Sequence, residues 1–173
     1  SLLKNLIVAM TYSHFYTEVK LVGIFDEDEK ELWQALRWLP HIWDAEEQTR
    51  YLAFDEKSAS SLSDLFHDLC RGEGKSDSTY YVFLMGSYRM AERLKVVSDI
   101  LNGGPGVNAS ILFAYDLGNI SADEQLGYLP QQCQFVVNLD FPPEPCCYDV
   151  TQTEKKALFT PDPEIKADAF DRY

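Results

Sequence analysis

The chain of 173 residues is long enough for one domain with a substantial buried core. Its residues are 46% hydrophobic and 13% aromatic, a composition that excludes an intrinsically disordered tail. The formal net charge of −13 argues against nucleic acid as a partner, because phosphate binding depends on clustered Lys and Arg.

The predicted elements alternate between helix and strand along most of the chain. In chain order they are a helix over about residues 2–14, a strand at 19–25, a helix to about 38, a short strand at 50–54, a helix at about 56–71, a strand at 80–85, a helix at about 89–101, and strands at 109–115 and 134–139. Asp28 and Glu31 form a capping-box pattern at the start of the second helix, and Pro40 is expected to stop it. A short helix can begin at Ser121.

The last part of the chain carries weaker patterns. Strands near 147–150 and 157–160 are expected to form an edge hairpin. Helical patterns at both ends of the chain, the last from Ile165 to Tyr173, indicate a fragment of a longer polypeptide. We therefore expect one N-terminally incomplete domain over residues 1–160, followed over residues 161–173 by the start of a linker helix to a next domain.

The alternation of elements defines the expected fold class. Apolar strands that alternate with helices favour a mostly parallel sheet covered on both faces. The run Tyr80–Met85 is continuously apolar, as expected for a strand that is buried on both faces. The sequence therefore predicts a three-layer, doubly wound α/β domain.

Three tryptophans lie within eleven residues near the end of the second predicted helix. Their block, called here the aromatic corner, consists of Trp33, Trp38, Leu39, Pro40, His41 and Trp43. The tryptophans either fill the groove between helix and sheet edge or present part of the corner to a partner. Trp38 shares the helical register of Leu32 and Leu36 and is expected in the core, whereas Trp43 lies beyond the proline and is expected nearer the surface. His41 is expected to hydrogen-bond locally and to orient the corner.

The segment from Lys20 to Trp43 resembles a signature of the type VII secretion ATPases. Its strand Lys20–Phe25, the acids that follow and the block Glu31–Trp43 are similar to a block of the EssC or EccC type, membrane-anchored relatives of FtsK and SpoIIIE. The remaining chain resembles the family more loosely. The resemblance implies a RecA-like, P-loop-NTPase-like fold in a cytosolic domain between transmembrane segments and ATPase modules, at the cytoplasmic face of the bacterial cell membrane.

The resemblance also implies the surroundings of this domain. A parent protein of this type uses ATP and Mg²⁺ to drive the export of small helical-hairpin proteins. The implied partners are neighbouring ATPase domains of the same chain, other secretion-system components and, through the parent, the secreted proteins. Nucleic acid is not among the expected partners.

Neither glycine-rich loop of the chain reads as an intact phosphate loop. The segment Gly72–Ser76 contains Gly-Lys-Ser, but Leu69 stands where the motif needs its first glycine, and the loop follows a helix instead of a strand. The segment Gly103–Gly106 lacks the Lys and the Ser or Thr. In the FtsK-like ATPases the strand corresponding to residues 80–85 ends in an acidic pair that holds Mg²⁺, whereas Gly86 and Ser87 follow it here.

Other candidate sites carry little chemistry. The acidic run Asp26–Glu29 follows a strand and could hold a divalent cation, although helix capping is the favoured interpretation. None of the three histidines has a Ser or Cys partner in a recognised nucleophile elbow. The four cysteines show no Cys-x-x-Cys spacing and are interpreted as small apolar core residues.

The expected function is a non-catalytic one. The resemblance and the degenerate position Gly86–Ser87 predict a pseudo-ATPase domain without catalytic residues, nucleotide, metal or cofactor of its own, which acts in coupling and assembly between the membrane segment and the ATPase modules. One alternative is a nucleotide hydrolase domain whose phosphate loop is missing from the fragment. Another is a free-standing protein-interaction adaptor.

Overall fold

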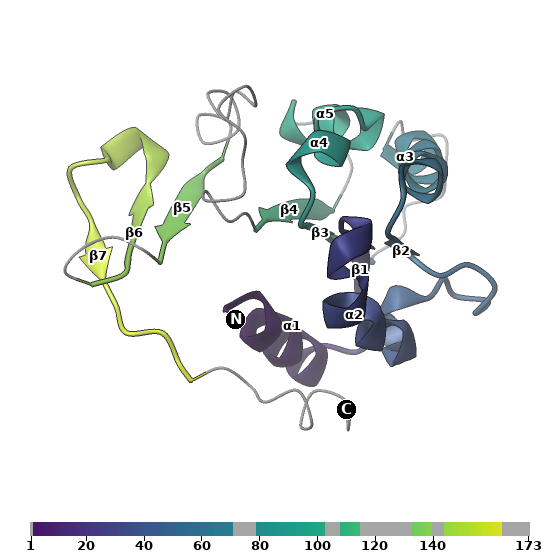
Figure 1. The fold of residues 1–173 in the computed structure, drawn as a ribbon, viewed down its shortest axis with the longest axis horizontal. Helices are drawn as coiled ribbons and strands as arrows, with labels where there is room; N and C mark the ends of the chain where they lie inside the picture. Colours follow the sequence, from purple (N-terminus) through teal and green to yellow (C-terminus); the bar gives the residue numbers. More distant parts are fainter. Residues whose placement is uncertain (1, 71–78, 103–107, 115–132, 140–143, 164–173) are drawn as a thin grey trace.

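The computed structural model describes residues 2–70, 79–102, 108–114, 133–139 and 144–163. Its centre is a four-stranded parallel sheet in the order β2-β1-β3-β4 (Figure 1). The strands are β1 Val19–Ile24, β2 Leu52–Ala53, β3 Tyr80–Met85 and β4 Ala109–Phe113. The predicted strands of this sheet are confirmed, the one at 50–54 in a shorter form.

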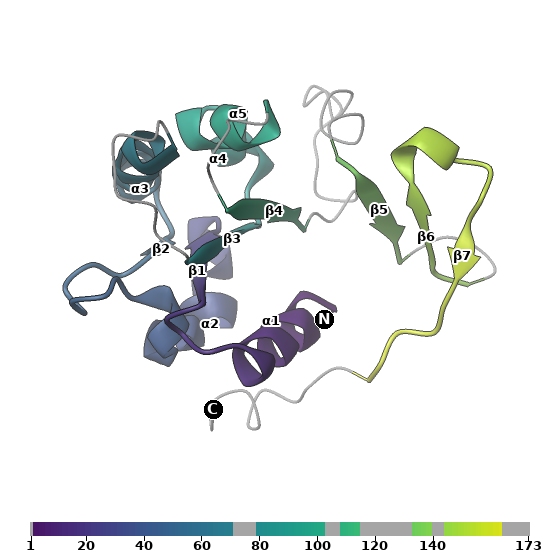
Figure 2. The ribbon, with the colours of Figure 1, turned by 180° about the vertical axis from the view of Figure 1, so that it is seen from behind.

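Helices cover both faces of the parallel sheet, so the three-layer α/β class is confirmed. Figures 1 and 2 show α1 (Leu2–Ser13) on one face. The opposite face carries α3 (Glu56–Cys70), α4 (Tyr88–Ala91) and α5 (Lys95–Leu101). All six residues of β1 are buried, as expected for a central parallel strand with both faces covered.

Aromatic side chains fill the core between the sheet and α3. The ring of Phe66 on α3 meets Tyr51, Tyr81 and Phe83 edge to face, with centroid distances of 5.0, 5.2 and 5.1 Å. Edge-to-face pairs of this kind add to the free energy gained by burying the rings. On the other face, Ile7 of α1 is completely buried against the sheet.

The second predicted helix is wrong as a continuous α-helix. A 3₁₀ turn, η1 (Glu27–Glu29), leads into one α-helical turn, α2 (Lys30–Trp33), and then into a second 3₁₀ helix, η2 (Gln34–Trp38). Asp28 lies inside η1, and no side chain caps η1 or α2, so the predicted capping box is absent from this segment. Pro40 starts a further 3₁₀ helix, η3 (Pro40–Ile42), at a position where its missing N–H costs nothing.

The helix predicted at about 89–101 is also divided. The chain leaves helical geometry between α4 and α5, where Leu94 is extended with φ −86° and ψ 125°. Ser87 caps α4, because its hydroxyl accepts a hydrogen bond from the Met90 N–H. The break lets α5 pack against both α3 and β4.

The strand expected at 134–139 does not extend the parallel sheet. It forms β5 (Phe135–Asn138) and pairs with the predicted hairpin, β6 (Cys146–Asp149) and β7 (Ala157–Leu158), in a separate antiparallel sheet. Burial alternates along β5, as expected for an antiparallel strand with one open face. The chain after β7 then reaches α1, where Asn5 Nδ2 donates to the Pro163 carbonyl at 3.1 Å.

Several predictions lie outside the described residues. These are the two glycine-rich loops at 72–76 and 103–106, the short helix expected from Ser121 and the helix expected over 165–173. The domain boundary at residue 160 stays a prediction. Within the described residues, no helix is long and apolar enough to span a bilayer.

Candidate functional site

The carboxyl edge of the parallel sheet is the place where an α/β domain is expected to bind a ligand. β1 and β3 pair in register, with Ile24 opposite Met85, so the residues that follow the two strands meet at this edge. The edge therefore brings together the acidic run Asp26–Glu29 and the pair Gly86–Ser87, which lie far apart in the sequence.

Side chains fill this edge at Gly86. Phe25 is completely buried and stacks on Trp33, with ring centroids 4.6 Å apart and an interplanar angle of 11°. A Cβ atom built on Gly86 would lie 2.5 Å from Phe25 Cδ1 and 2.8 Å from Glu29 Oε2. Any side chain at position 86 would therefore force Phe25 and Glu29 to shift, and an acidic one would collide with both.

The Ser87 hydroxyl forms hydrogen bonds to two neighbouring elements. Ser87 is completely buried, and its hydroxyl donates to Asp26 Oδ1 at 2.7 Å while accepting from the Met90 N–H at 3.3 Å. Arg89 Nη2 lies 3.9 Å from the same carboxylate oxygen, at an exposed position where such a pair contributes little. Ser87 thus joins the turn after β1 to the start of α4.

A carboxylate does stand over the end of β3, but it comes from another element. Glu29 reaches Gly86 from η1, and its Oε2 atom is buried. Burial raises the pKa of Glu29, and the charges of Asp26 and Asp28 act in the same direction, whereas the nearby Trp33 indole lowers this pKa. Neither Glu29 Oε2 nor Trp33 Nε1 completes a hydrogen bond within the described residues. Residue spacing alone does not predict this placement of Glu29.

The acidic run does not gather into a recognisable metal site. In the part of the chain that the structure describes, no group of three or more His, Cys, Asp or Glu side chains is placed to hold a metal ion. Asp26 is instead bound to Ser87, and Glu29 lies over Gly86. Asp26 and Glu29 therefore contribute to the packing of the edge, whereas Glu27 and Asp28 are exposed.

The aromatic corner has two rows of side chains with a period of three residues. The inner row, defined as Trp33, Leu36 and Leu39, faces the core, and Trp33 and Leu36 are 4% and 0% exposed. The outer row, defined as Leu32 and Trp38, faces away, and these two side chains are 46% and 70% exposed, whereas Ala35 between them packs against the core. Residues three apart eclipse each other in a 3₁₀ helix, and η2 begins directly after Trp33.

The prediction that Trp38 lies in the core is therefore wrong. An α-helical register with Leu32 and Leu36 would place Trp38 in the core, but the 3₁₀ geometry of η2 turns it outward. Trp43 is half-buried, and its Nε1 donates to the Arg37 carbonyl at 3.1 Å. The Arg50 guanidinium covers the Trp43 ring at 4.4 Å from the centroid, so this tryptophan holds the loop after η3 in place.

His41 connects the corner to α1. It is buried, and its Nε2 donates to the His14 carbonyl at 2.9 Å, a contact between residues distant in sequence instead of the local one predicted. Burial lowers the pKa of His41, and the charge of Lys20 lowers it further, so the imidazole is neutral at pH 7. Lys20 Nζ in turn donates to the carbonyl of Pro40 at 3.3 Å, so β1 also holds the corner.

The fold and the similarity to known proteins point to the same class. The parallel sheet with helices on both faces is consistent with a RecA-like α/β fold. Neither a family model nor a solved structure matches the chain. The chain is similar to the ESX secretion system protein EccC of Geobacillus thermodenitrificans (strain NG80-2), with 21% identity over 119 residues. The match covers 65% of this chain but 8% of that protein, and it supports a relationship to EccC-type proteins.

Proposed function

We propose that this chain is a non-catalytic domain of a membrane-anchored, EccC-type secretion ATPase, with a role in coupling and assembly. In this proposal the domain lies at the cytoplasmic face of the bacterial membrane, between the membrane segment and the ATPase modules. The observation that carries the non-catalytic part is the filled carboxyl edge, where Phe25 and Glu29 rest against Gly86. The similarity to EccC supports the secretion context.

The filled edge is unsuited to a nucleotide for steric and electrostatic reasons. A nucleotide there would need the volume that Phe25 and Trp33 occupy in a stacked pair. The turn after β1 carries four consecutive acids, Asp26–Glu29, whose negative charge repels a triphosphate. The turn after β3 offers a single hydroxyl, and Asp26 and the start of α4 already bind it.

In this proposal the domain binds other parts of the secretion machinery and does not itself hydrolyse ATP. Its proposed partners are the neighbouring ATPase domains of the parent and other components of the secretion system. ATP and Mg²⁺ belong to the parent, and helical-hairpin secreted proteins meet the domain through that parent.

Calorimetric titration of the whole chain with Mg-ATP tests the non-catalytic role. We expect no saturable heat and no phosphate release above background. Micromolar affinity or measurable turnover would overturn the proposal and would support the nucleotide hydrolase instead.

A secretion assay in an EccC-type parent that carries this domain tests the coupling role. Gly86→Val forces Phe25 and Glu29 out of the filled edge. We expect export to fall while ATP turnover by the other modules of the parent stays measurable. Unchanged export with this substitution would contradict a coupling role.

A further inference from the structure

The outer row is an exposed apolar surface on a rigidly held segment. Leu32 and Trp38 are 46% and 70% exposed. The inner row beneath them is anchored by Trp33, which is 4% exposed and stacks on Phe25. The orientation of the outer row is thus set by the core, and docking there requires little ordering of the backbone.

Trp38 is held in place from one side. The Arg37 guanidinium lies 4.8 Å from the centroid of the Trp38 ring, a cation–π arrangement. The backbone of Arg37 is fixed as well, because its carbonyl accepts the Trp43 indole N–H at 3.1 Å. An aromatic ring held in this way is suited to act as an anchor residue at an interface.

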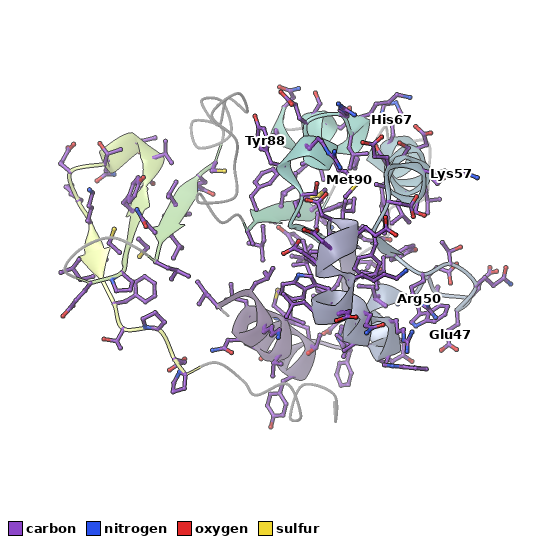
Figure 3. All side chains as sticks on the ribbon, in the orientation of Figure 1. Glu47, Arg50, Lys57, His67, Tyr88 and Met90 are labelled. Atoms are coloured by element: carbon purple, nitrogen blue, oxygen red, sulfur yellow. The ribbon has the colours of Figure 1, made fainter. Side chains whose placement is uncertain are left out.

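Acidic residues predominate in the segment that carries the outer row, and Arg37 is the cation that lies against the Trp38 ring. The segment 26–50 contains eight acidic residues and three Lys or Arg. Asp28 and Glu31 are exposed and lie four residues and one residue before Leu32 in the sequence. Glu47 lies on the loop that projects past the β2 edge (Figure 3). A second copy of this chain, an anionic membrane and a nucleic acid would all bring negative charge to this surface. Charge complementarity therefore selects a basic protein partner.

The length of the outer row fits a helix. The six residue steps from Leu32 to Trp38 span roughly 9–12 Å in mixed α and 3₁₀ geometry. That distance is about two turns of an α-helix. A partner helix that carries apolar residues at i, i+3 or i+4 and i+7 presents anchors at the same spacing.

We propose that the outer row docks a basic, amphipathic α-helix of a partner protein. Its apolar side chains pack on Leu32 and Trp38, and its Lys or Arg side chains face Asp28 and Glu31. This inference deepens the coupling role proposed above and rests on it for its place in secretion. It names the chemistry of the partner that the domain holds.

A peptide assay with the whole chain tests the docking surface. The probe is a designed helical peptide with Leu on one face and Lys on the other, labelled for fluorescence anisotropy. Leu32→Ala with Trp38→Ala should weaken its binding about tenfold. The matched control is Phe135→Ala with Leu158→Ala, which removes an aromatic and a leucine that are 62% and 52% exposed on the other sheet. The control should change binding less than about twofold.

A second pair of variants separates the local charge from the net charge. Asp28→Lys with Glu31→Lys should weaken binding more than Glu92→Lys with Glu154→Lys, although both pairs change the net charge equally. All four acids are exposed, so circular dichroism should show folded proteins for both pairs. Equal effects of the two pairs, or equal effects of the apolar pairs, would overturn the proposal.

Other occupants give different outcomes in the same experiment. Self-association in sedimentation that Trp38→Ala abolishes, or Trp38-dependent binding to vesicles of anionic phospholipid, would replace the basic helix by a second copy or a membrane. The peptide assay and the Mg-ATP titration can fail independently. Failure of peptide binding would not change the expected absence of Mg-ATP binding, and Mg-ATP binding would not change the result of the peptide assay.

Discussion

The inner and outer rows of the segment from Lys30 to Leu39 have opposite environments although their residues alternate along one short stretch. The inner row contributes Trp33 and Leu36 to the core, with exposures of 4% and 0%. The outer row leaves Trp38 70% exposed. Because residues of similar hydrophobicity occupy both rows, hydrophobicity alone does not separate the fold-stabilising side chains from those free to meet a partner. The period of the helix separates them.

The largest expected effect distinguishes the two rows directly. Trp33→Ala should lower the free energy of unfolding by about 3–5 kcal/mol, because it removes a buried ring and leaves a cavity beside Phe25. Trp38→Ala should stay within about 0.5 kcal/mol of the wild type, because its ring is exposed. Urea denaturation at pH 7 measures both. Equal losses would show that the outer row also belongs to the core.

The next effect tests how tightly Phe25 and Glu29 pack against Gly86 at the carboxyl edge of the sheet. Gly86→Ala should cost about 1–3 kcal/mol, because the new methyl group meets Phe25 and Glu29 at distances that force a shift. A double-mutant cycle with Phe25→Ala provides the control. The double variant should lose less stability than the two single losses predict, because the collision is gone. Strict additivity would mean that Gly86 and Phe25 do not interact.

A smaller effect concerns Trp43, whose indole connects the loop after η3 to Arg37 in η2. Trp43→Phe removes the hydrogen bond from Nε1 to the Arg37 carbonyl and should cost about 1 kcal/mol. Trp38→Phe makes the same exchange at an exposed ring and should cost less. Thermal denaturation of the two variants measures the difference. A larger loss for Trp38→Phe would be inconsistent with this arrangement.

The smallest effect is the pH dependence of stability that Glu29 adds at the carboxyl edge, over Gly86. Burial raises the pKa of Glu29 above its ordinary value of 4.5 in the folded state. The folded state therefore holds this proton more tightly, and the stability that results is present below pH 4.5 and is lost as the pH rises through the raised pKa. Glu29→Gln cannot ionise, so its free energy of unfolding should fall less than that of the wild type over this window.

Urea denaturation at a series of pH values checks this prediction. Glu31→Gln makes the same exchange at an exposed position and serves as the control. A Glu29→Gln profile parallel to the wild type would show that the carboxyl group over Gly86 is well solvated in the folded state.

The elements of the parallel sheet were predictable because their patterns are local. The apolar runs at Val19–Ile24 and Tyr80–Met85 are long and continuous, as buried parallel strands require, and the structure contains both. The α3 helix was predictable from its apolar spacing for the same reason. The placement of Glu29 over Gly86 could not be foreseen, because it depends on the parallel register of β1 and β3 and on how η1 folds back.

The amino-acid sequence specifies an α/β chain with a strongly acidic composition, an aromatic corner, and Gly86 and Ser87 in place of acids directly after β3. It leaves open which tryptophans of the corner are buried, because the same spacing fits an α-helical and a 3₁₀ register. Tertiary packing resolves this choice: stacking Trp33 on Phe25 against the Gly86 backbone favours the shorter period, and that period turns Leu32 and Trp38 outward. Packing against residues distant in sequence thereby selects which face of a short helix belongs to the core and which is left for a partner.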